Sequence, residues 1–248
     1  MALVSIVTYN LYYSRAFTHA CSLLMQERPD ILCLQEVETD QKVLKDLNRG
    51  EYRLASYTNA FMKYQKNFGN AIVYNSDRYE CLDVVSCDLP KGIYDLLMVV
   101  LHGLNNLRTT IHATFREKES GRIIHVYNVH LSHIGSATHR LNQLRKVLAE
   151  DLDNKSDNES VVVCGDFNFY SGRRHLQEFI DNHYLDEATK QLSYTFQHRK
   201  LGIPVMTSKL DYVLFRNLIH LDTNRLPSNV SDHFPIRSRF SLDRGHTR

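Results

Sequence analysis

Six short polar motifs follow one another along this chain, and each closes or directly follows a stretch that is typical of a β-strand. Their polar members are carboxylates, amides and histidines, which supply hard oxygen ligands together with groups that hold or transfer a proton. A Mg²⁺-assisted hydrolase of phosphoesters needs this combination, and the sequence therefore predicts such chemistry. The motifs contribute Asn10, Glu36, His130, Asp166, Asn168, Asp211, Asp232 and His233.

The motif GlyAspPheAsn (165–168) directly follows a short apolar run. Residues two apart on an extended segment point the same way, so Asp166 and Asn168 face one side. We predict that Asp166 holds or deprotonates an attacking water, while Asn168 donates a hydrogen bond to the phosphoryl oxygens. An Asx-turn after the strand, favoured by Gly165, is the alternative interpretation.

Asp232 and His233 form the second distinctive motif. A histidine beside a carboxylate can be held as an imidazolium that faces a phosphate. Because neighbouring residues on a strand point to opposite sides, Asp232 is a poor partner for His233, and we predict Asp211 as the partner instead. Asp232 would then face a metal ion or its waters.

A metal site is predicted from the ends of two early strands. Glu36 follows an apolar run at 31–35, and Asn10 follows an alternating run at 3–8. Magnesium binds proteins through one or two carboxylates and keeps several waters. We therefore predict Glu36, Asn10 and Asp232 as ligands of Mg²⁺, with Mn²⁺ as the alternative ion. Taken alone, Glu36 could be a solvated loop residue and Asn10 a turn residue.

His130 ends a well-patterned strand, whereas most of the thirteen histidines are expected to be surface or structural residues. Just beyond it lie Ser132 and His133, and Arg140 falls near the start of an expected helix at 137–152. We predict His130 as a catalytic residue and the other three as contacts for a substrate phosphate, because a guanidinium suits phosphate. A solvated helix face is the alternative for Arg140.

The elements that must position these residues alternate between strands and a few helices. Apolar residues at helical spacing predict helices at 16–26, 39–48, 137–152 and 173–181. Strand patterns occur at 3–8, 31–35, 52–57, 71–74, 82–87, 109–115, 123–131, 161–164, 209–215 and 234–240. Since both halves supply site residues and no linker separates them, we expect one domain over 1–248, an α/β sandwich of two packed sheets with helices outside.

Composition narrows the class of protein. The 248 residues carry a net charge of only +2, and a strong sequence-independent nucleic-acid binder is usually more basic. The five cysteines show no paired CxxC spacing, which favours buried free thiols and a reducing, intracellular compartment. Residues 1–10 lack the features of a signal peptide, and no run approaches the roughly 18 apolar residues of a membrane span. We expect a monomer without a transmembrane segment.

From Thr8 to Pro235 the motifs and their order resemble the endonuclease/exonuclease/phosphatase superfamily, the DNase I-like proteins. The resemblance implies a four-layer α/β sandwich of two mixed sheets and a divalent metal, normally Mg²⁺ or Mn²⁺. It also implies water attack at phosphorus, charge neutralisation by the metal and protonation of the leaving oxygen. The matching residues are Asn10 (first-strand asparagine), Glu36 (metal glutamate), His130 (histidine of the DNase-like and phosphatase branches), Asp166 and Asn168 (GlyAspXxxAsn), Asp211 (aspartate that orients the last histidine) and Asp232–His233 (SerAspHis).

Two positions depart from parts of this family. Several members carry an acidic residue where this chain has Tyr12, and His130 argues against the apurinic/apyrimidinic endonuclease branch. The segment 130–143 is similar to tyrosyl-DNA phosphodiesterase 2 and to uncharacterised bacterial relatives. That enzyme has Glu in place of Ser132 and a tryptophan in place of Phe234, so we do not assign the chain to it.

The substrate is expected to contact variable loops, at 12–17, 61–70, 89–108 and 170–175. Basic and aromatic residues mix at 63–66 and 173–175, which favours a phosphodiesterase acting on nucleic acid or a nucleotide-linked diester. An inositol-phosphate phosphatase or a sphingomyelinase-type phospholipase is the alternative, and it predicts a separate cationic pocket. A non-catalytic binding module is a third hypothesis. We expect the apolar run at 93–100 to be a strand, and contact with a lipid is the alternative.

Overall fold

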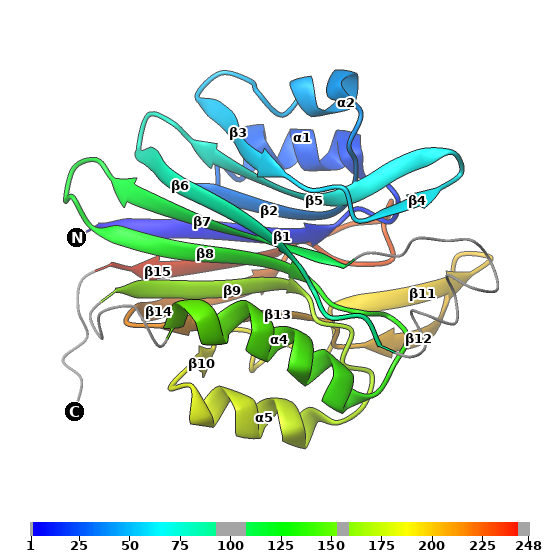
Figure 1. The fold of residues 1–248 in the computed structure, drawn as a ribbon. Helices are drawn as coiled ribbons and strands as arrows, with labels where there is room; N and C mark the ends of the chain where they lie inside the picture. The colour runs from blue at the N-terminus through cyan, green and yellow to red at the C-terminus, as the bar shows by residue number, and fades with distance from the viewer. Residues whose placement is uncertain (1, 93–107, 153–158, 243–248) are drawn as a thin grey trace.

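The computed structural model describes residues 2–92, 108–152 and 159–242. Two mixed β-sheets pack face to face, with helices on their outer faces (Figure 1). From edge to edge the first sheet contains β14 (Ile219–Arg225), β15 (Ile236–Ser241), β1 (Leu3–Asn10), β2 (Ile31–Glu38), β5 (Lys66–Asn75) and β3 (Tyr52–Tyr57), with β4 (Phe61–Lys63) paired to β5. The second contains β10 (Asp186–Glu187), β13 (Asp211–Arg216), β9 (Ser160–Asp166), β8 (Ile123–His130), β7 (Thr109–Glu117) and β6 (Tyr79–Asp88).

Three apolar clusters hold the layers together. The central cluster lies between the sheets, where alternate residues such as Ile6 and Ile31 of one sheet meet Ile111 and Ile124 of the other. A second cluster joins the outer face of the first sheet to α1 (Phe17–Gln26) and α2 (Gln41–Lys45). A third joins the second sheet to α4 (Ala137–Leu152) and α5 (Arg173–Asn182). The predicted four-layer sandwich is therefore confirmed.

Each sheet has one parallel strand pair at its centre, and these two pairs build the site edge. β1 runs parallel to β2, with Asn10 beside Gln35, and β8 runs parallel to β9, with His130 beside Asp166. β13 runs antiparallel to β9 and begins with Asp211 opposite Asp166. Because parallel strands end on the same side, side chains far apart in the sequence meet at one edge of the sandwich.

Gly165 allows β9 to approach β8 just before Asp166. Its φ is +137°, and a Cβ atom there would lie 2.0 Å from the carbonyl oxygen of Val129. Only glycine fits this close backbone approach without strain. The turn that Gly165 was expected to favour also forms, because Asn168 N donates to Asp166 Oδ1 at 3.0 Å. The Asx-turn interpretation is therefore confirmed, whereas the two residues do not share one extended segment, because β9 ends at Asp166 and Asn168 has a φ of +54°.

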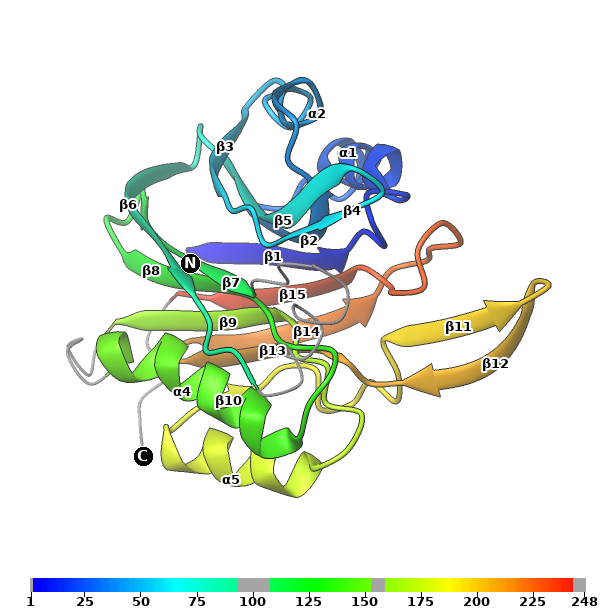
Figure 2. The same ribbon diagram turned by 45° about the vertical axis from the view of Figure 1, so that its right-hand side comes forward.

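The structure contains strands that the sequence patterns did not predict. β4 lies in a segment that we expected to be a loop, and β10 and β14 were not expected. β11 (Phe196–Lys200) and β12 (Ile203–Ser208) form a separate hairpin that extends from the body of the sandwich (Figure 2). The run at 93–100 lies outside the described residues.

Two further expectations from the sequence concern the cysteines and membrane-spanning segments. All five cysteines are free, as expected, although Cys81 and Cys87 are only partly buried. Within residues 2–92, 108–152 and 159–242, no helix is long and apolar enough to cross a membrane.

Candidate active site

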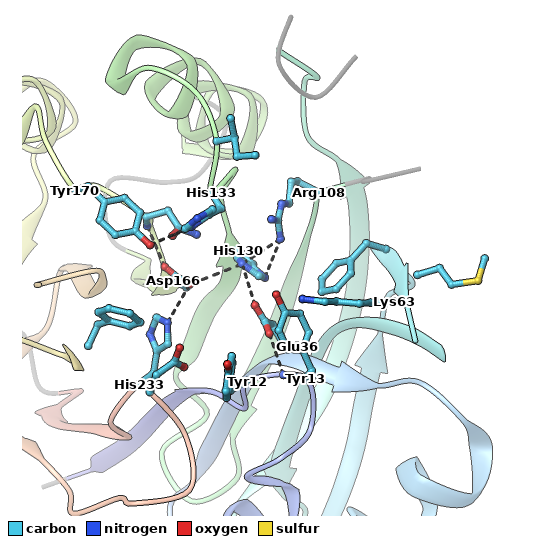
Figure 3. A pocket seen from close by; sticks show the side chains of 16 residues that line it. Tyr12, Tyr13, Glu36, Lys63, Arg108, His130, His133, Asp166, Tyr170 and His233 are labelled. Carbon is cyan, nitrogen blue, oxygen red and sulfur yellow. Dashed lines mark hydrogen bonds and ion pairs between the residues drawn. The ribbon is translucent and has the colours of Figure 1, made fainter. Parts of the chain in front are cut away.

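A cavity of about 350 Å³ opens at the edge where the two parallel strand pairs end (Figure 3). Seven of the residues predicted from the sequence line it, and they come from both sheets. The seven are Glu36, His130, His133, Asp166, Asn168, Asp232 and His233. Two further predicted residues, Asn10 and Asp211, lie behind the lining and hydrogen-bond to members of it.

Glu36 reaches the cavity because β2 contains a bulge. The register of β2 against β5 shifts between Leu34 and Val37, and Glu36 has a φ of +56°. Bulges of this kind redirect a side chain and often lie beside active sites. Glu36 Oε2 accepts the backbone N–H of Tyr13 at 2.9 Å. Burial raises the pKa of Glu36, against the opposing effect of nearby positive charge.

Asp166 is the central carboxylate of the cavity. Its Oδ2 accepts from Asn10 Nδ2 at 2.9 Å, and the same oxygen lies 3.7 Å from both His130 Nε2 and His233 Nε2 (Figure 3). Burial is the main cause that raises the pKa of Asp166, to about 7, and the carboxylates of Asp211 and Glu36 add to it. A carboxylate with a pKa near neutrality is suited to act as a general base.

His233 and Asp211 form a buried pair. His233 Nδ1 lies 2.9 Å from Asp211 Oδ2, so its Nε2 is left to face the cavity. Burial by itself would lower the pKa of His233, but the carboxylates of Asp211 and Asp166 raise it to about 10. The imidazole is therefore held as a cation. The structure places Asp211, and not Asp232, beside His233, as the strand-alternation argument expected.

Asp232 supports the presence of a cation site. Its Oδ1 is buried and has no hydrogen-bond partner among the described residues, although the side chain lines the cavity together with Glu36. Buried polar atoms are normally satisfied, and paired carboxylate oxygens are the ligands that Mg²⁺ prefers. Asp232 and Glu36 therefore fit a divalent cation.

Asn10 and His233 already form hydrogen bonds with neighbouring side chains near the cavity. Asn10 was predicted as a metal ligand, but its Nδ2 donates to Asp166 and its Oδ1 accepts from Tyr12 N at 3.0 Å. Asp166, Asp211 and His233 lie close enough together to hold an ion. Because His233 Nδ1 is already bonded to Asp211, we assign these two residues to a hydrogen-bonded pair, with Asp166 as an ion-pair neighbour 3.7 Å from His233 Nε2.

Arg108 is a cavity residue that sequence reasoning did not single out, although it ends a loop expected to contact substrate. Its Nη1 lies 3.1 Å from His130 Nε2 and 3.4 Å from Nδ1, so the guanidinium contacts both nitrogens of the imidazole. Burial is the main cause that lowers the pKa of His130, and the charge of Arg108 adds to it. His130 is therefore a neutral imidazole. Among the described residues, Lys63 and Arg108 are the cavity's only lysine and arginine.

Arg140 does not line the cavity, in contrast to the prediction that it contacts a phosphate. Its buried guanidinium donates to the carbonyls of Ser132 (2.8 Å), His133 (2.7 Å) and Gly135 (2.9 Å). Ser132 is fully buried and bonds Gln143 through both N and Oγ, so it too lies outside the cavity. These two residues fix the loop that carries His133, which does line the cavity.

The basic motif at 173–175 also lies elsewhere. Arg173 forms an ion pair with the buried carboxylate of Glu187, and Arg174 is exposed on α5. From the loop at 170–175 only Tyr170 lines the cavity, where its hydroxyl lies 3.0 Å from His133 Nδ1. Phe196 was not predicted at all. It lies at the base of the β11–β12 hairpin, with its ring 5.0 Å from that of His233.

Replacing Arg140 by Ala is expected to lower the free energy of unfolding by about 3 kcal/mol, because the bonds from a charged donor to buried carbonyls are lost. Urea denaturation measures the loss. Arg145→Ala, an exposed arginine on the same helix, is the matched control and should cost little. A stable Arg140→Ala protein with a raised KM would instead support the original phosphate role.

Comparison with known proteins places this chain in one family. The model of the Endonuclease/Exonuclease/phosphatase family matches residues 7–233. The chain belongs to this family. Members of this family are phosphodiesterases and phosphatases that generally depend on a divalent metal.

Individual relatives are only 17% to 30% identical to this chain in sequence. Protein angel of Drosophila melanogaster is 30% identical over 151 residues, which are 58% of this chain and 40% of that protein, so the chain spans less than half of its length. The structure of ANGEL2, described as a 2′,3′-cyclic phosphatase, has a TM-score of 0.77 at 18% identity, covering 97% of this chain and 95% of that chain. D. rerio TDP2 complexed with a single-strand DNA product has a TM-score of 0.70 at 17% identity, covering 97% and 100%. These structures show the fold alone.

Proposed function

We propose that this chain is a divalent-metal-dependent phosphodiesterase that hydrolyses nucleic acid or a nucleotide-linked diester. The proposal rests on three kinds of group that line one cavity. They are Asp166, a carboxylate with a raised pKa, the histidine cation of His233, and two further carboxylates. These groups supply a base, positive charge for phosphoryl oxygens and cation ligands. A binding module would need none of the three.

Asp166 is the proposed general base. In its ionised form it takes a proton from a water that attacks phosphorus, and Asn10 keeps the carboxylate oriented through the 2.9 Å bond. As the new P–O bond forms, the bond from phosphorus to the leaving oxygen breaks, and the leaving oxygen takes a proton from solvent. The imidazolium of His233 donates from Nε2 to a phosphoryl oxygen and offsets the charge that develops there. The neutral imidazole of His130 donates a further hydrogen bond to a phosphoryl oxygen. Asn168 also lines the cavity; its Nδ2 donates to the backbone oxygen of Leu131 at 3.0 Å, and we propose that its second N–H completes the set of donors.

Glu36 and Asp232 are the residues that would hold the cation, which we propose to be Mg²⁺, with Mn²⁺ as the alternative. A divalent cation bound there would neutralise phosphoryl oxygens and lower the charge barrier to attack. Both carboxylates line the same cavity as Asp166, so a cation held by them would leave Asp166 available as the base.

A nucleotide-type substrate fits the cavity walls better than the alternatives do. Aromatic side chains form much of the lining, with Lys63 and Arg108 beside them, and single-stranded nucleic acids are bound by such a combination. An inositol polyphosphate carries several phosphates, for which two cationic side chains are few. ANGEL2 is described as a 2′,3′-cyclic phosphatase and TDP2 was crystallised with a DNA product, which supports the same class of substrate.

The test is hydrolysis of a substrate panel by the wild type, with Mg²⁺ and with EDTA, and by Asp166→Asn as the blank. The panel holds single- and double-stranded DNA, RNA, a 5′-tyrosyl oligonucleotide, a 2′,3′-cyclic phosphate oligonucleotide, an inositol polyphosphate and sphingomyelin. We expect cleavage of a nucleotide substrate that EDTA abolishes. Hydrolysis of only the inositol phosphate or the lipid would replace the proposal by the phosphatase or phospholipase alternative.

A further inference from the structure

A strained turn presents two tyrosines to the cavity. Tyr12, Tyr13 and Ser14 directly follow β1 and have φ angles of 49°, 54° and 59°. The left-handed region is unfavourable for residues with a side chain, so three in succession must be held by their surroundings. Strain of this kind gathers at ligand-binding and active sites. Tyr12 and Tyr13 both line the cavity, and the proposed catalytic steps use neither of them.

The turn is held by the residues of the site itself. Tyr12 N donates to Asn10 Oδ1 at 3.0 Å, and Tyr13 N donates to Glu36 Oε2 at 2.9 Å. Ser14 N donates to the backbone oxygen of Glu36, also at 2.9 Å. The backbone of the two tyrosines is therefore fixed relative to Asn10 and Glu36.

The two tyrosines belong to a cluster of rings centred on Tyr13. Tyr13 lies 5.4 Å from Tyr12, 6.1 Å from Phe61 and 6.2 Å from Tyr64, measured between ring centroids. We call these four residues the aromatic wall. Tyr64, in the turn between β4 and β5, is 67% exposed, so the wall continues from the catalytic groups to the solvent.

All four members of the aromatic wall have a cation over a ring face, and one of these cations, Lys63 Nζ, lies 5.2 Å from the ring centroid of Tyr64. Arg15 Cζ lies 4.4 Å from the ring centroid of Tyr12, Lys63 Nζ lies 3.7 Å from that of Tyr13, and Arg108 Cζ lies 5.4 Å from that of Phe61. Rings that alternate with cations can bind a ligand that alternates flat bases with phosphates. Figure 3 shows Tyr13 and Lys63 beside Glu36, on the side of the cavity away from Tyr170.

We propose that the aromatic wall binds the bases of a single-stranded nucleic acid, with Tyr12 and Tyr13 stacking the base next to the phosphate that is hydrolysed. This inference rests on the proposed function and adds to it a subsite and a strand direction, from Tyr12 outwards to Tyr64. A lipid tail would need an aliphatic wall, and a single sugar ring would not extend to the exposed Tyr64. A chain of nucleotides meets both the length of the wall and its charges.

The test compares two fluorescent oligonucleotides of the same short length, one with bases and one abasic, by anisotropy in the presence of Mg²⁺. Binding is measured in an Asp166→Asn background so that turnover does not interfere. Adding Tyr12→Ala is expected to weaken binding of the base-containing strand about tenfold and to leave the abasic strand unchanged. Tyr12→Phe keeps the ring and should bind both strands as its parent does.

Tyr184→Ala is the matched control, because Tyr184 also has a positive φ, of 50°, yet is 83% exposed and lies outside the cavity lining. It should bind both strands like its parent. Equal losses on the two strands, or no loss with Tyr12→Ala, would overturn the subsite. Cleavage assays on the same strands separate the two proposals. Base-dependent binding without cleavage supports the subsite and contradicts the proposed function. Cleavage that does not depend on Tyr12 supports the proposed function and contradicts the subsite.

Discussion

Asp166→Asn is expected to lower kcat on the order of a thousandfold, because the amide cannot accept a proton from the attacking water. The substitution keeps the shape of the side chain, and its oxygen can still accept one of the bonds from Asn10 Nδ2 and Asn168 N. Single-turnover measurements with saturating Mg²⁺ isolate this step from product release. KM should change much less than kcat, since the carboxylate is proposed to act on water and not on the substrate.

The same substitution should leave stability unchanged or higher, which separates a chemical loss from unfolding. Burial raises the pKa of Asp166 to about 7, so above that pH the folded protein bears the cost of an ionised buried group. A neutral amide removes this cost. Asp77→Asn, at an exposed aspartate, controls for the change in net charge. A drop in Tm that accompanies the lost activity would point to a structural role instead.

The parallel strand pairs explain why the sequence located so much of the site. Motifs at the ends of predicted strands indicate residues near a common edge, and His130 and Asp166 are direct neighbours in the parallel register. Such local geometry is readable from one sequence because it follows from the period of the strand. Alternation along a strand argued only against Asp232 as the partner of His233, and in the structure His233 lies before β15, in an isolated bridge with Phe196.

Glu36 shows the limit of that argument. It was expected just beyond a strand end, but it lies within β2, where a bulge and a positive φ turn it into the cavity. A bulge depends on pairing with β5, which is distant in sequence, so a local pattern does not reveal it. Glu36 therefore lines the cavity as expected, but because of the bulge in β2 and not because the strand ends before it.

Arg140 and Arg108 show a second limit, which concerns long polar side chains. Arg140 looked exposed at the start of a helix, but the fold turns it inward onto three loop carbonyls. Arg108 carried no motif, yet it contacts His130. The reach of a guanidinium allows several partners, and only the tertiary structure decides among them. Phe196 was missed because the β11–β12 hairpin itself was not predicted.

Asp211→Asn is expected to lower kcat by about a hundredfold to a thousandfold, because His233 then loses the carboxylate that holds it as a cation. Of the charges that raise the pKa of His233, Asp211 has the largest effect, so the variant's imidazole deprotonates at lower pH. The activity of the variant should therefore fall as the pH rises through a range in which His233 of the wild type stays protonated. Stopped assays across that range measure the shift, and Asp222→Asn, in an exposed ion pair with Arg239, is the control.

A double-mutant cycle with His233→Gln tests whether the two residues act as a unit. If Asp211 works only through His233, the double variant should be about as slow as His233→Gln alone, and the two losses will not add. Stability gives an independent readout, since the pKa of His233 is raised from 6.5 to about 10 by folding. The stabilisation from this pair is thus fully present below about pH 6.5 and is lost as the pH rises towards 10, so the deficit of Asp211→Asn should be larger at pH 7 than at pH 10. Additive losses in kcat, or a deficit that grows with pH, would show that Asp211 acts on something other than His233.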